Sequence, residues 1–247
     1  MASLSSLRAA KKELRTLMKQ NLIKISSESI NAQTVAVYKA ITSFDPYLNA
    51  NRVGIYLSMP TGELQTDPIV RHALGSGKQV FVPYLHKATN PSPGTPKSVM
   101  DMVKLHSLAD YESLSRDSWG IPTIDAETVS EREHILGEIA IEGCGKLDMI
   151  LMPGVAFEKD LGNASIKRLG HGKGFYDFFL HRYSEGRGTA AKELALGPGT
   201  DALLYGLALE EQELGSELSV PVGEYDHRLH GLFVGNGQLV DGHTNIA

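Results

Sequence analysis

Residues 168–177 read Arg-Leu-Gly-His-Gly-Lys-Gly-Phe-Tyr-Asp, which sets three glycines at alternate positions among basic side chains and a closing carboxylate. Glycine can adopt positive φ and lets backbone N–H groups approach an anion closely. Arg168 and Lys173 add positive charge that suits a phosphate, and Asp177 can hold a magnesium ion on that phosphate. The stretch therefore indicates a phosphate-binding loop, with a tight turn as the competing interpretation.

The flanking sequence predicts a strand before this loop and a helix after it. Residues 147–152 are almost entirely apolar, as a buried strand requires, and residues 175–183 carry an apolar stripe at helical spacing. A strand, a glycine-rich loop and a helix in succession place a phosphate at a helix N-terminus. The loop is not a P-loop, because Gly174 follows Lys173 where Ser or Thr is needed, and it lacks the dinucleotide pattern Gly-x-Gly-x-x-Gly.

The rest of the chain alternates strands with helices. This alternation predicts a single α/β domain of three layers over residues 1–247, with a mostly parallel sheet covered by helices on both faces. Ligands of such sheets bind beyond the carboxyl ends of the strands, where both Glu63 and the loop at 168–177 are expected. Surface loops are predicted near 88–97 and 184–200. The predicted strands are 52–57, 79–83, 99–106, 147–152, 202–209 and 232–234, and the predicted helices are 5–25, 28–44, 68–75, 131–142 and 175–183.

Composition and charge exclude several classes of protein. A formal net charge of −5 argues against a general nucleic-acid binder, which needs a clear basic excess. No apolar run approaches the roughly 18 residues of a membrane span. The single Cys144 cannot form an intrachain disulfide, which suits a reducing compartment. We therefore expect a cytoplasmic protein, with a mitochondrial presequence in the acid-poor N-terminus as the alternative.

Several stretches, in order along the chain, resemble the 5-formyltetrahydrofolate cyclo-ligase family, also called methenyltetrahydrofolate synthetases. The family signature is Pro-Gly-x-x-Phe, a short connector and Arg-Leu-Gly-x-Gly-x-Gly-Tyr-Tyr-Asp, which residues 153–157 and 168–177 resemble. The connector is longer here, and Phe175 stands where the first tyrosine is usual. The resemblance spans residues 7–230 and also includes Lys11-x-x-x-Arg15, 57–59 with Glu63, 100–102, 118–122, and 220–222 with Asp226.

The resemblance implies both a fold and a reaction. The fold would be related to those of ribose-5-phosphate isomerases and CoA transferases. The reaction would be the ATP- and Mg²⁺-dependent cyclisation of 5-formyltetrahydrofolate to 5,10-methenyltetrahydrofolate, with release of ADP and phosphate. The partners would be the folate and ATP, with no nucleic acid or membrane, and the protein would act as a monomer. Two alternatives stay open: an isomerase or transferase relative that does not use ATP, and a non-catalytic folate-binding regulator.

The resemblance also implies roles for particular residues. Arg168, Lys173 and Tyr176 are expected to be catalytic, and Asp177 and Asp226 are expected to hold the metal. The residues expected to bind ATP are Lys11, Arg15, Arg168, Gly170, His171, Gly172, Lys173, Gly174, Phe175 and Tyr176. The residues expected to bind the folate are Leu57, Met59, Glu63, Met100, Met102, Trp119 and Tyr176.

These residues also have plain structural interpretations. Lys11 and Arg15 are four apart on one face of a predicted helix, where they could form a solvated charged surface. Glu63 could be an exposed loop carboxylate. Asp177 could be a charge favoured at a helix N-terminus, and Asp226 an ordinary surface acid. Core packing is the alternative for Tyr176, Leu57, Met59, Met100, Met102 and Trp119.

Overall fold

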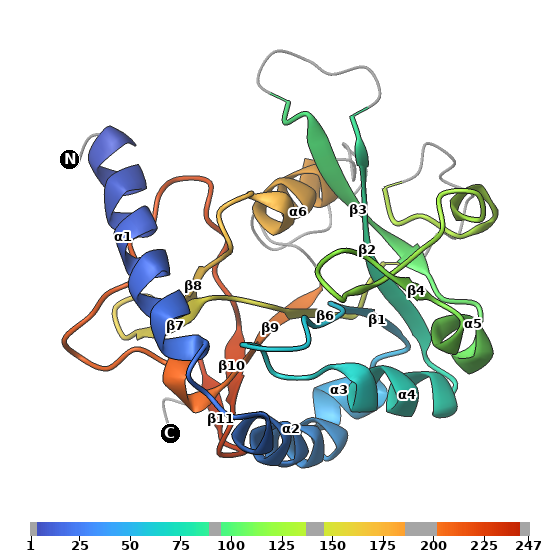
Figure 1. Ribbon diagram of the computed structural model, residues 1–247, viewed down its shortest axis with the longest axis horizontal. Helices are drawn as coiled ribbons and strands as arrows, with labels where there is room; N and C mark the ends of the chain where they lie inside the picture. Colours follow the sequence, from blue (N-terminus) through green and yellow to red (C-terminus); the bar gives the residue numbers. More distant parts are fainter. Residues whose placement is uncertain (1–3, 89–94, 137–145, 186–201, 243–247) are drawn as a thin grey trace, which may run out of the picture.

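The computed structural model describes residues 4–88, 95–136, 146–185 and 202–242, which form a seven-stranded sheet with helices around it (Figure 1). The strand order is β11-β10-β9-β6-β1-β2-β3. The five central strands pair in parallel, and only the two edge strands, β3 and β11, are antiparallel to their neighbours. The predicted, mostly parallel sheet is therefore confirmed. Its strands are β1 (Arg52–Ile55), β2 (Gln79–Lys87), β3 (Ser98–Lys104), β6 (Met149–Met152), β9 (Leu203–Ala208), β10 (Gly231–Val234) and β11 (Leu239–Asp241).

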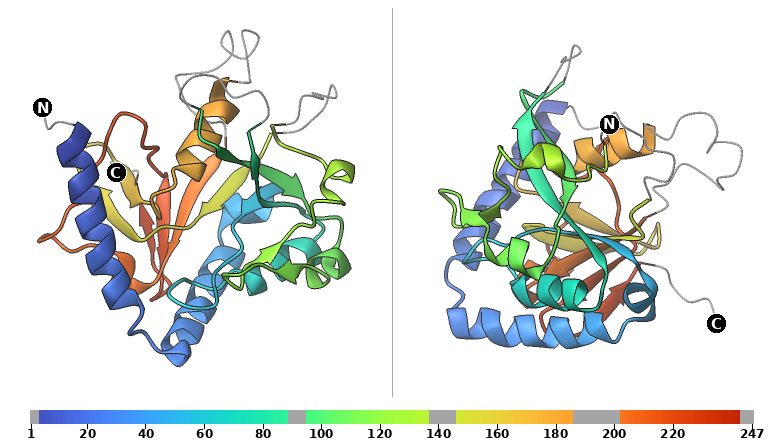
Figure 2. Two further views of the ribbon diagram at one scale, coloured as in Figure 1. Left: turned by 45° about the horizontal axis from the view of Figure 1, so that its top comes forward. Right: turned by 90° about the vertical axis from the view of Figure 1, so that its right-hand side faces the viewer.

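Helices cover both faces of this sheet (Figures 1 and 2). Side chains alternate between the faces along the central strand β6: Met149 and Leu151 join one buried cluster, and Ile150 and Met152 join the other. Helices α2 and α4 pack into the first cluster, and α6 packs into the second. A strand buried on both faces must be apolar throughout, which explains the uninterrupted apolar sequence of β6.

The helices agree closely with the sequence prediction, except at residues 131–142. The structure has α1 (Leu4–Leu22), α2 (Ser27–Thr42), α3 (Asp45–Asn49), α4 (Asp67–Gly75), α5 (Leu108–Glu112) and α6 (Phe175–Glu185), with short 3-10 turns η1 (Val129–Glu131) and η2 (Glu210–Gln212). Neither α3 nor α5 is predicted from the sequence. The predicted surface loops at 88–97 and 184–200 fall largely on residues 89–94 and 186–201, outside the described part of the chain.

The helix predicted at 131–142 is wrong over its described part. After η1 the chain runs alongside β3, where the Ile135 N–H donates to the Met102 carbonyl at 3.0 Å. The buried carboxylate of Asp101 accepts hydrogen bonds from the Leu136 N–H at 3.0 Å and from the His134 ring at 3.0 Å. These long-range bonds override the local helix preference; residues 137–145 lie outside the described part of the chain.

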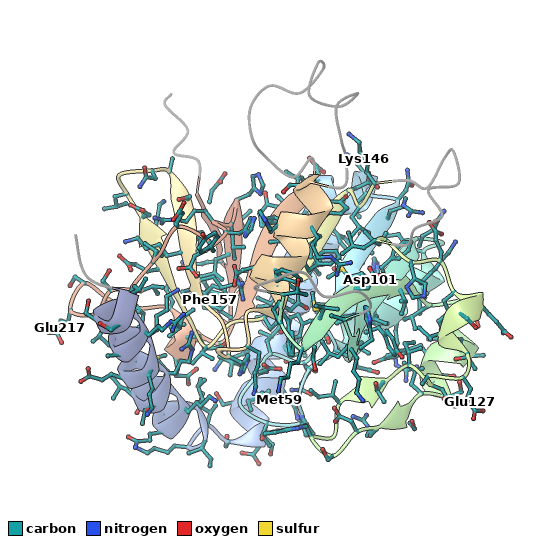
Figure 3. All side chains as sticks on the ribbon, turned by 90° about the horizontal axis from the view of Figure 1, so that it is seen from above. Met59, Asp101, Glu127, Lys146, Phe157 and Glu217 are labelled. Carbon is teal, nitrogen blue, oxygen red and sulfur yellow. The ribbon has the colours of Figure 1, made fainter. Side chains whose placement is uncertain are left out.

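The sequence analysis also missed a hairpin between β6 and the glycine-rich loop. Strands β7 (Ala156–Asp160) and β8 (Ser165–Leu169) pair antiparallel, so the loop does not follow β6 directly as predicted. Phe157 of β7, labelled in Figure 3, is fully buried in the α6-side cluster and anchors the hairpin to the sheet. The Val155 N–H donates to the Leu169 carbonyl at 2.7 Å, which returns the chain to the carboxyl end of β6 before the loop begins.

Candidate functional site

The glycine-rich loop connects β8 to α6 and depends on glycine at two positions. Gly172 has φ of 101° and Gly174 has φ of 70°, and residues other than glycine rarely adopt such positive φ angles. A Cβ at Gly172 would also lie 3.3 Å from the Arg15 guanidinium. The first turn of α6 begins at Phe175, where free backbone N–H groups and the helix dipole favour an anion.

Lys11 and Arg15 of α1 face this loop, so they do not form a solvated surface. Arg15 Nε donates to the Gly170 carbonyl at 2.8 Å, and Lys11 Nζ pairs with an Asp226 carboxylate oxygen at 2.7 Å. The same side of α1 also carries the buried residues Leu14, Met18 and Leu22, so this side packs against the rest of the fold. Lys12 is exposed. Burial lowers the pKa of Arg15, against the opposing effect of Asp226 and Asp177.

A pocket of about 140 Å³, here called the loop pocket, lies where α1, β8, the glycine-rich loop and the 223–227 segment meet. It brings together three of the predicted ATP-binding cations and both predicted metal ligands. Lys173 is exposed and does not line it, so the role of that side chain stays a prediction. The lining residues are Lys11, Arg15, Arg168, Leu169, Gly170, Gly172, Gly174, Asp177 and Asp226.

Both carboxylates of the loop pocket are paired with cations. The side chain of Arg168 is only 3% exposed and donates to both oxygens of Asp177 at 3.1 Å. Burial acts to raise the pKa of Asp177, but Arg168 and the hydrogen bonds from His227 lower it to about 2. Asp226 accepts from Lys11 and from the Gly223 N–H at 2.6 Å. Asp177 is therefore held as an anion, and Asp226 is bound as a hydrogen-bond acceptor.

The donor set of the loop pocket fits magnesium held jointly with a phosphate. Magnesium takes one or two carboxylates and fills its other positions with water and phosphate oxygens. Among the described residues no group of three or more histidine, cysteine or acidic side chains is placed to hold a metal by itself. Two carboxylates beside three cations therefore suit a metal that arrives with a polyanion, rather than an all-protein metal cage.

Glu63 is buried, at 5% exposure, and joins the loop after β1 to the glycine-rich loop. One carboxylate oxygen accepts from the Met59 N–H at 3.0 Å, and the other accepts from His171 Nε2 at 2.9 Å. The loop after β1 lies at the carboxyl end of its strand, as predicted from the sheet topology. The glycine-rich loop reaches the same edge by another route, because β8 of the hairpin returns to the end of β6. The interpretation of Glu63 as an exposed loop acid is therefore wrong.

Tyr176 lies on the first turn of α6, close to Glu63 and Arg168. The Arg168 guanidinium lies 5.6 Å from the centre of its ring. Burial raises the pKa of the Tyr176 hydroxyl strongly, Arg168 opposes this rise, and Glu63 adds to it. The hydroxyl oxygen is inaccessible and has no hydrogen-bond partner among the described residues. Since an unpaired buried hydroxyl is costly, this atom is suited to a polar group of a ligand.

The other predicted folate-binding residues are divided between the core and the surface. Leu57, Met100 and Met102 are buried in the two core clusters, so packing accounts for them, and their contact with folate stays a prediction. Met59, labelled in Figure 3, is half-buried in the loop after β1. Trp119 is 72% exposed at the tip of the hairpin β4 (Ser115–Arg116) and β5 (Pro122–Thr123).

The Trp119 hairpin packs against the loop that carries Glu63. A Cβ at Gly120 would lie 2.7 Å from the Pro60 ring, so the tip of the hairpin and that loop are in direct contact. The structure therefore brings Met59, Glu63 and Trp119 into one neighbourhood. Phe175 is half-buried at the start of α6 and packs against the α6-side cluster.

The sequence analysis missed a second hollow of about 290 Å³, which adjoins the loop pocket at Gly174 and Asp177. Its other lining residues come from α6 and from the 224–227 segment. The His227 N–H donates to Asp177 Oδ1 at 3.2 Å, and the buried Nδ1 of its ring lies 3.8 Å from the same oxygen. In the sequence, the one feature that pointed to this hollow was the placement of Tyr225 and His227 on either side of Asp226. The lining residues are Gly174, Asp177, Phe178, His181, Glu224, Tyr225 and His227.

Comparison with known proteins agrees with this geometry. The family model described as the 5-formyltetrahydrofolate cyclo-ligase family matches residues 7–234. The chain belongs to this family. It is therefore an enzyme, and its family indicates 5-formyltetrahydrofolate cyclo-ligase activity. The resemblance seen in the sequence is thereby confirmed.

Individual relatives support the assignment to the cyclo-ligase family. A probable 5-formyltetrahydrofolate cyclo-ligase of Caenorhabditis elegans is 34% identical over 92% of this chain and 93% of its own length. The mouse 5-formyltetrahydrofolate cyclo-ligase is 34% identical over 70% of this chain and 75% of its own. The solved structure of Aquifex aeolicus 5,10-methenyltetrahydrofolate synthetase shares the fold, with a TM-score of 0.63 at 20% identity over 96% of this chain and 95% of that one.

No helix in the described ranges is both long and apolar enough to cross a membrane.

Replacing Gly172 by alanine should destabilise the protein by more than about 1 kcal/mol, because a side chain at positive φ is strained and the new Cβ would press on Arg15. Urea unfolding would measure the loss. Gly215→Ala is the matched control, since that glycine has open space around its Cβ position. Equal unfolding midpoints for the two variants would contradict the strained geometry of the loop.

Proposed function

We propose that the protein closes the ring of 5-formyltetrahydrofolate to give 5,10-methenyltetrahydrofolate, in a reaction that consumes ATP with Mg²⁺ and releases ADP and phosphate. The observation that carries this proposal is the loop pocket, which gathers three cations and two carboxylates around a glycine-rich loop. The same loop contacts the buried Glu63 through His171. A site for a polyphosphate thus adjoins a buried acceptor for the second substrate.

The chemistry explains why ATP is needed. The formyl group is amide-like, so its carbon is a poor electrophile and its oxygen a poor leaving group. Transfer of the γ-phosphoryl group to that oxygen, with ADP leaving, gives an iminium phosphate. The N10 lone pair then attacks the carbon, N10 releases its proton to solvent, and the C–O bond breaks to release phosphate. No protein nucleophile is required, so positioning and charge stabilisation carry the catalysis.

The cations of the loop pocket suit the polyphosphate. Lys11 offers a point charge, whereas Arg15 and Arg168 can each offer two parallel N–H donors. In this proposal Asp177 and Asp226 hold the magnesium ion, which would neutralise charge on the phosphate oxygens when bound. Lys173, on the exposed side of the loop, would reach the transferred phosphoryl group when substrates fill the site.

The residues around Glu63 suit the folate. The amino and ring N–H groups of a pterin form a donor edge, and a buried carboxylate is the acceptor that such an edge needs. The Tyr176 hydroxyl, buried and unpaired among the described residues, is suited to the formyl oxygen. Met59 and Trp119 would supply apolar and aromatic surface for the ring system.

A direct assay tests the proposal. The protein is incubated with ATP, Mg²⁺ and 5-formyltetrahydrofolate, and methenyl absorbance and ADP are followed together. Equal amounts of the two products are expected. Methenyl formation without ATP would favour a different reaction, and folate binding without ADP formation would identify a non-catalytic regulator.

Replacing Lys173 by alanine should lower turnover by at least about 100-fold while leaving the unfolding midpoint unchanged, because the side chain is exposed and would act only on the transferred group. Steady-state kinetics at saturating substrates would measure this. Lys12→Ala removes another exposed lysine and serves as the control. Near-normal turnover of the Lys173 variant would remove this residue from the mechanism.

Replacing either Asp177 or Asp226 by asparagine should raise the Mg²⁺ concentration needed for half-maximal activity by about 10-fold or more, because each change removes one anionic ligand. A magnesium titration at fixed ATP would measure this requirement. The control is Asp125→Asn. Asp125 is exposed and does not line the loop pocket. An unchanged requirement in both site variants would rule out a metal role for these carboxylates.

A further inference from the structure

A hydrogen bond of 2.9 Å between His171 Nε2 and a Glu63 carboxylate oxygen joins the glycine-rich loop to the loop after β1. We propose that His171 is a positioning residue: its imidazole orients the Glu63 carboxylate for the folate and couples folate binding to nucleotide binding at the glycine-rich loop. This inference rests on the proposed function, and it concerns a position that the family signature leaves variable.

The hydrogen bonds to Glu63 fix the plane of its carboxylate. An ionised carboxylate can accept about four hydrogen bonds, two on each oxygen. His171 Nε2 occupies one position on one oxygen at 2.9 Å, and the Met59 N–H occupies one on the other at 3.0 Å. Among the described residues, each oxygen therefore has one protein donor and one further accepting position. Such a pair can receive two parallel donors from one edge of a ring, which is the pattern that a pterin presents.

The proton arrangement of His171 follows from this contact. With Glu63 ionised, its oxygen accepts, and the hydrogen of this bond is assigned to Nε2. The Glu63 side chain is 6% exposed and that of His171 is 35% exposed, so the bond is largely shielded on the glutamate side. Without the imidazole, the Met59 N–H would be the one donor left to the buried Glu63 carboxylate among the described residues. The carboxylate could then rotate away from the folate.

The position of His171 depends in turn on α1. Arg15 Nε binds the carbonyl of Gly170 on one side of His171, and the Arg15 guanidinium packs against Gly172 on the other. A polyphosphate that draws Arg15 or the loop amides toward itself therefore also sets the imidazole that holds Glu63. Binding free energy is reciprocal between coupled sites, so nucleotide and folate should each strengthen binding of the other.

The test measures binding as well as turnover in three variants. His171→Ala removes the donor, His171→Gln keeps an N–H donor on a side chain of similar reach, and His106→Ala removes an exposed histidine that lines neither hollow. The dissociation constant for 5-formyltetrahydrofolate is titrated with and without a non-hydrolysable ATP analogue. The constant for the analogue alone is measured in parallel.

His171→Ala should weaken folate binding by about 10-fold or more, the usual effect of losing a hydrogen bond to a charged group. The dissociation constants for folate with and without the analogue should become nearly equal. Affinity for the analogue alone should change by less than about threefold, because the His171 side chain does not line the loop pocket and its contact is with Glu63. The KM for folate should rise more than kcat falls. His171→Gln should recover most of the folate affinity, and His106→Ala should match the wild type.

A double-mutant cycle with Glu63→Gln separates positioning from a general structural effect. If His171 acts through Glu63, the folate-binding losses of the two single variants will not add in the double variant. Additive losses, or unchanged folate affinity and coupling in His171→Ala, would overturn the proposal. Because these are binding constants, they test His171 even if the wild type forms no methenyl product, a result that would instead refute the proposed function.

Discussion

The site depends on charge compensation among five ionised side chains in one small pocket. Lys11, Arg15 and Arg168 all line it, and three cations so close together would repel one another if nothing lay between them. Asp177 pairs with the nearly inaccessible Arg168, and Asp226 pairs with Lys11. A buried cation without a partner is destabilising, so pairing with Asp177 stabilises the nearly inaccessible Arg168 in the folded chain.

The same compensation prepares the site for a charged ligand. The carboxylates pair with Lys11 and Arg168, and Arg15 donates to the Gly170 carbonyl. In the proposed function, a polyphosphate arriving with magnesium would replace both partners, because its oxygens would pair with the cations and the metal would pair with the carboxylates. The proposed exchange keeps every charge paired, and so it avoids the desolvation cost of binding a polyanion in a site of bare positive charge.

Much of the fold could be predicted from the sequence because most of its elements follow local rules. The apolar sequence of β6 and the helical spacing of Leu14, Met18 and Leu22 each depend on a periodic pattern of burial. The exceptions depend on distant partners. Residues 132–136 run beside β3 because Asp101 binds them, and neither residue of such a pair reveals this in its own neighbourhood.

The site, too, has features that follow local sequence patterns and features that depend on distant partners. The glycine-rich loop could be recognised from its composition, and Lys11 and Arg15 could be placed on one helix face. The β7–β8 hairpin could not be recognised as easily, because its strands are short and half exposed along much of their length. The partners Lys11–Asp226 and His171–Glu63 are separated by 215 and 108 residues, so their pairing is a property of the folded chain alone.

The β7–β8 hairpin explains how one loop contacts both α1 and the loop after β1. If the loop followed β6 directly, its direction would be set by that strand alone. Instead β8 returns to the end of β6 through the Val155–Leu169 hydrogen bond, and Arg168 enters the loop already buried against Asp177. The backbone of residues 170–174 is then held between α1 on one side and Glu63 on the other. In the proposed coupling, a displacement at Arg15 would reach Glu63 through this backbone.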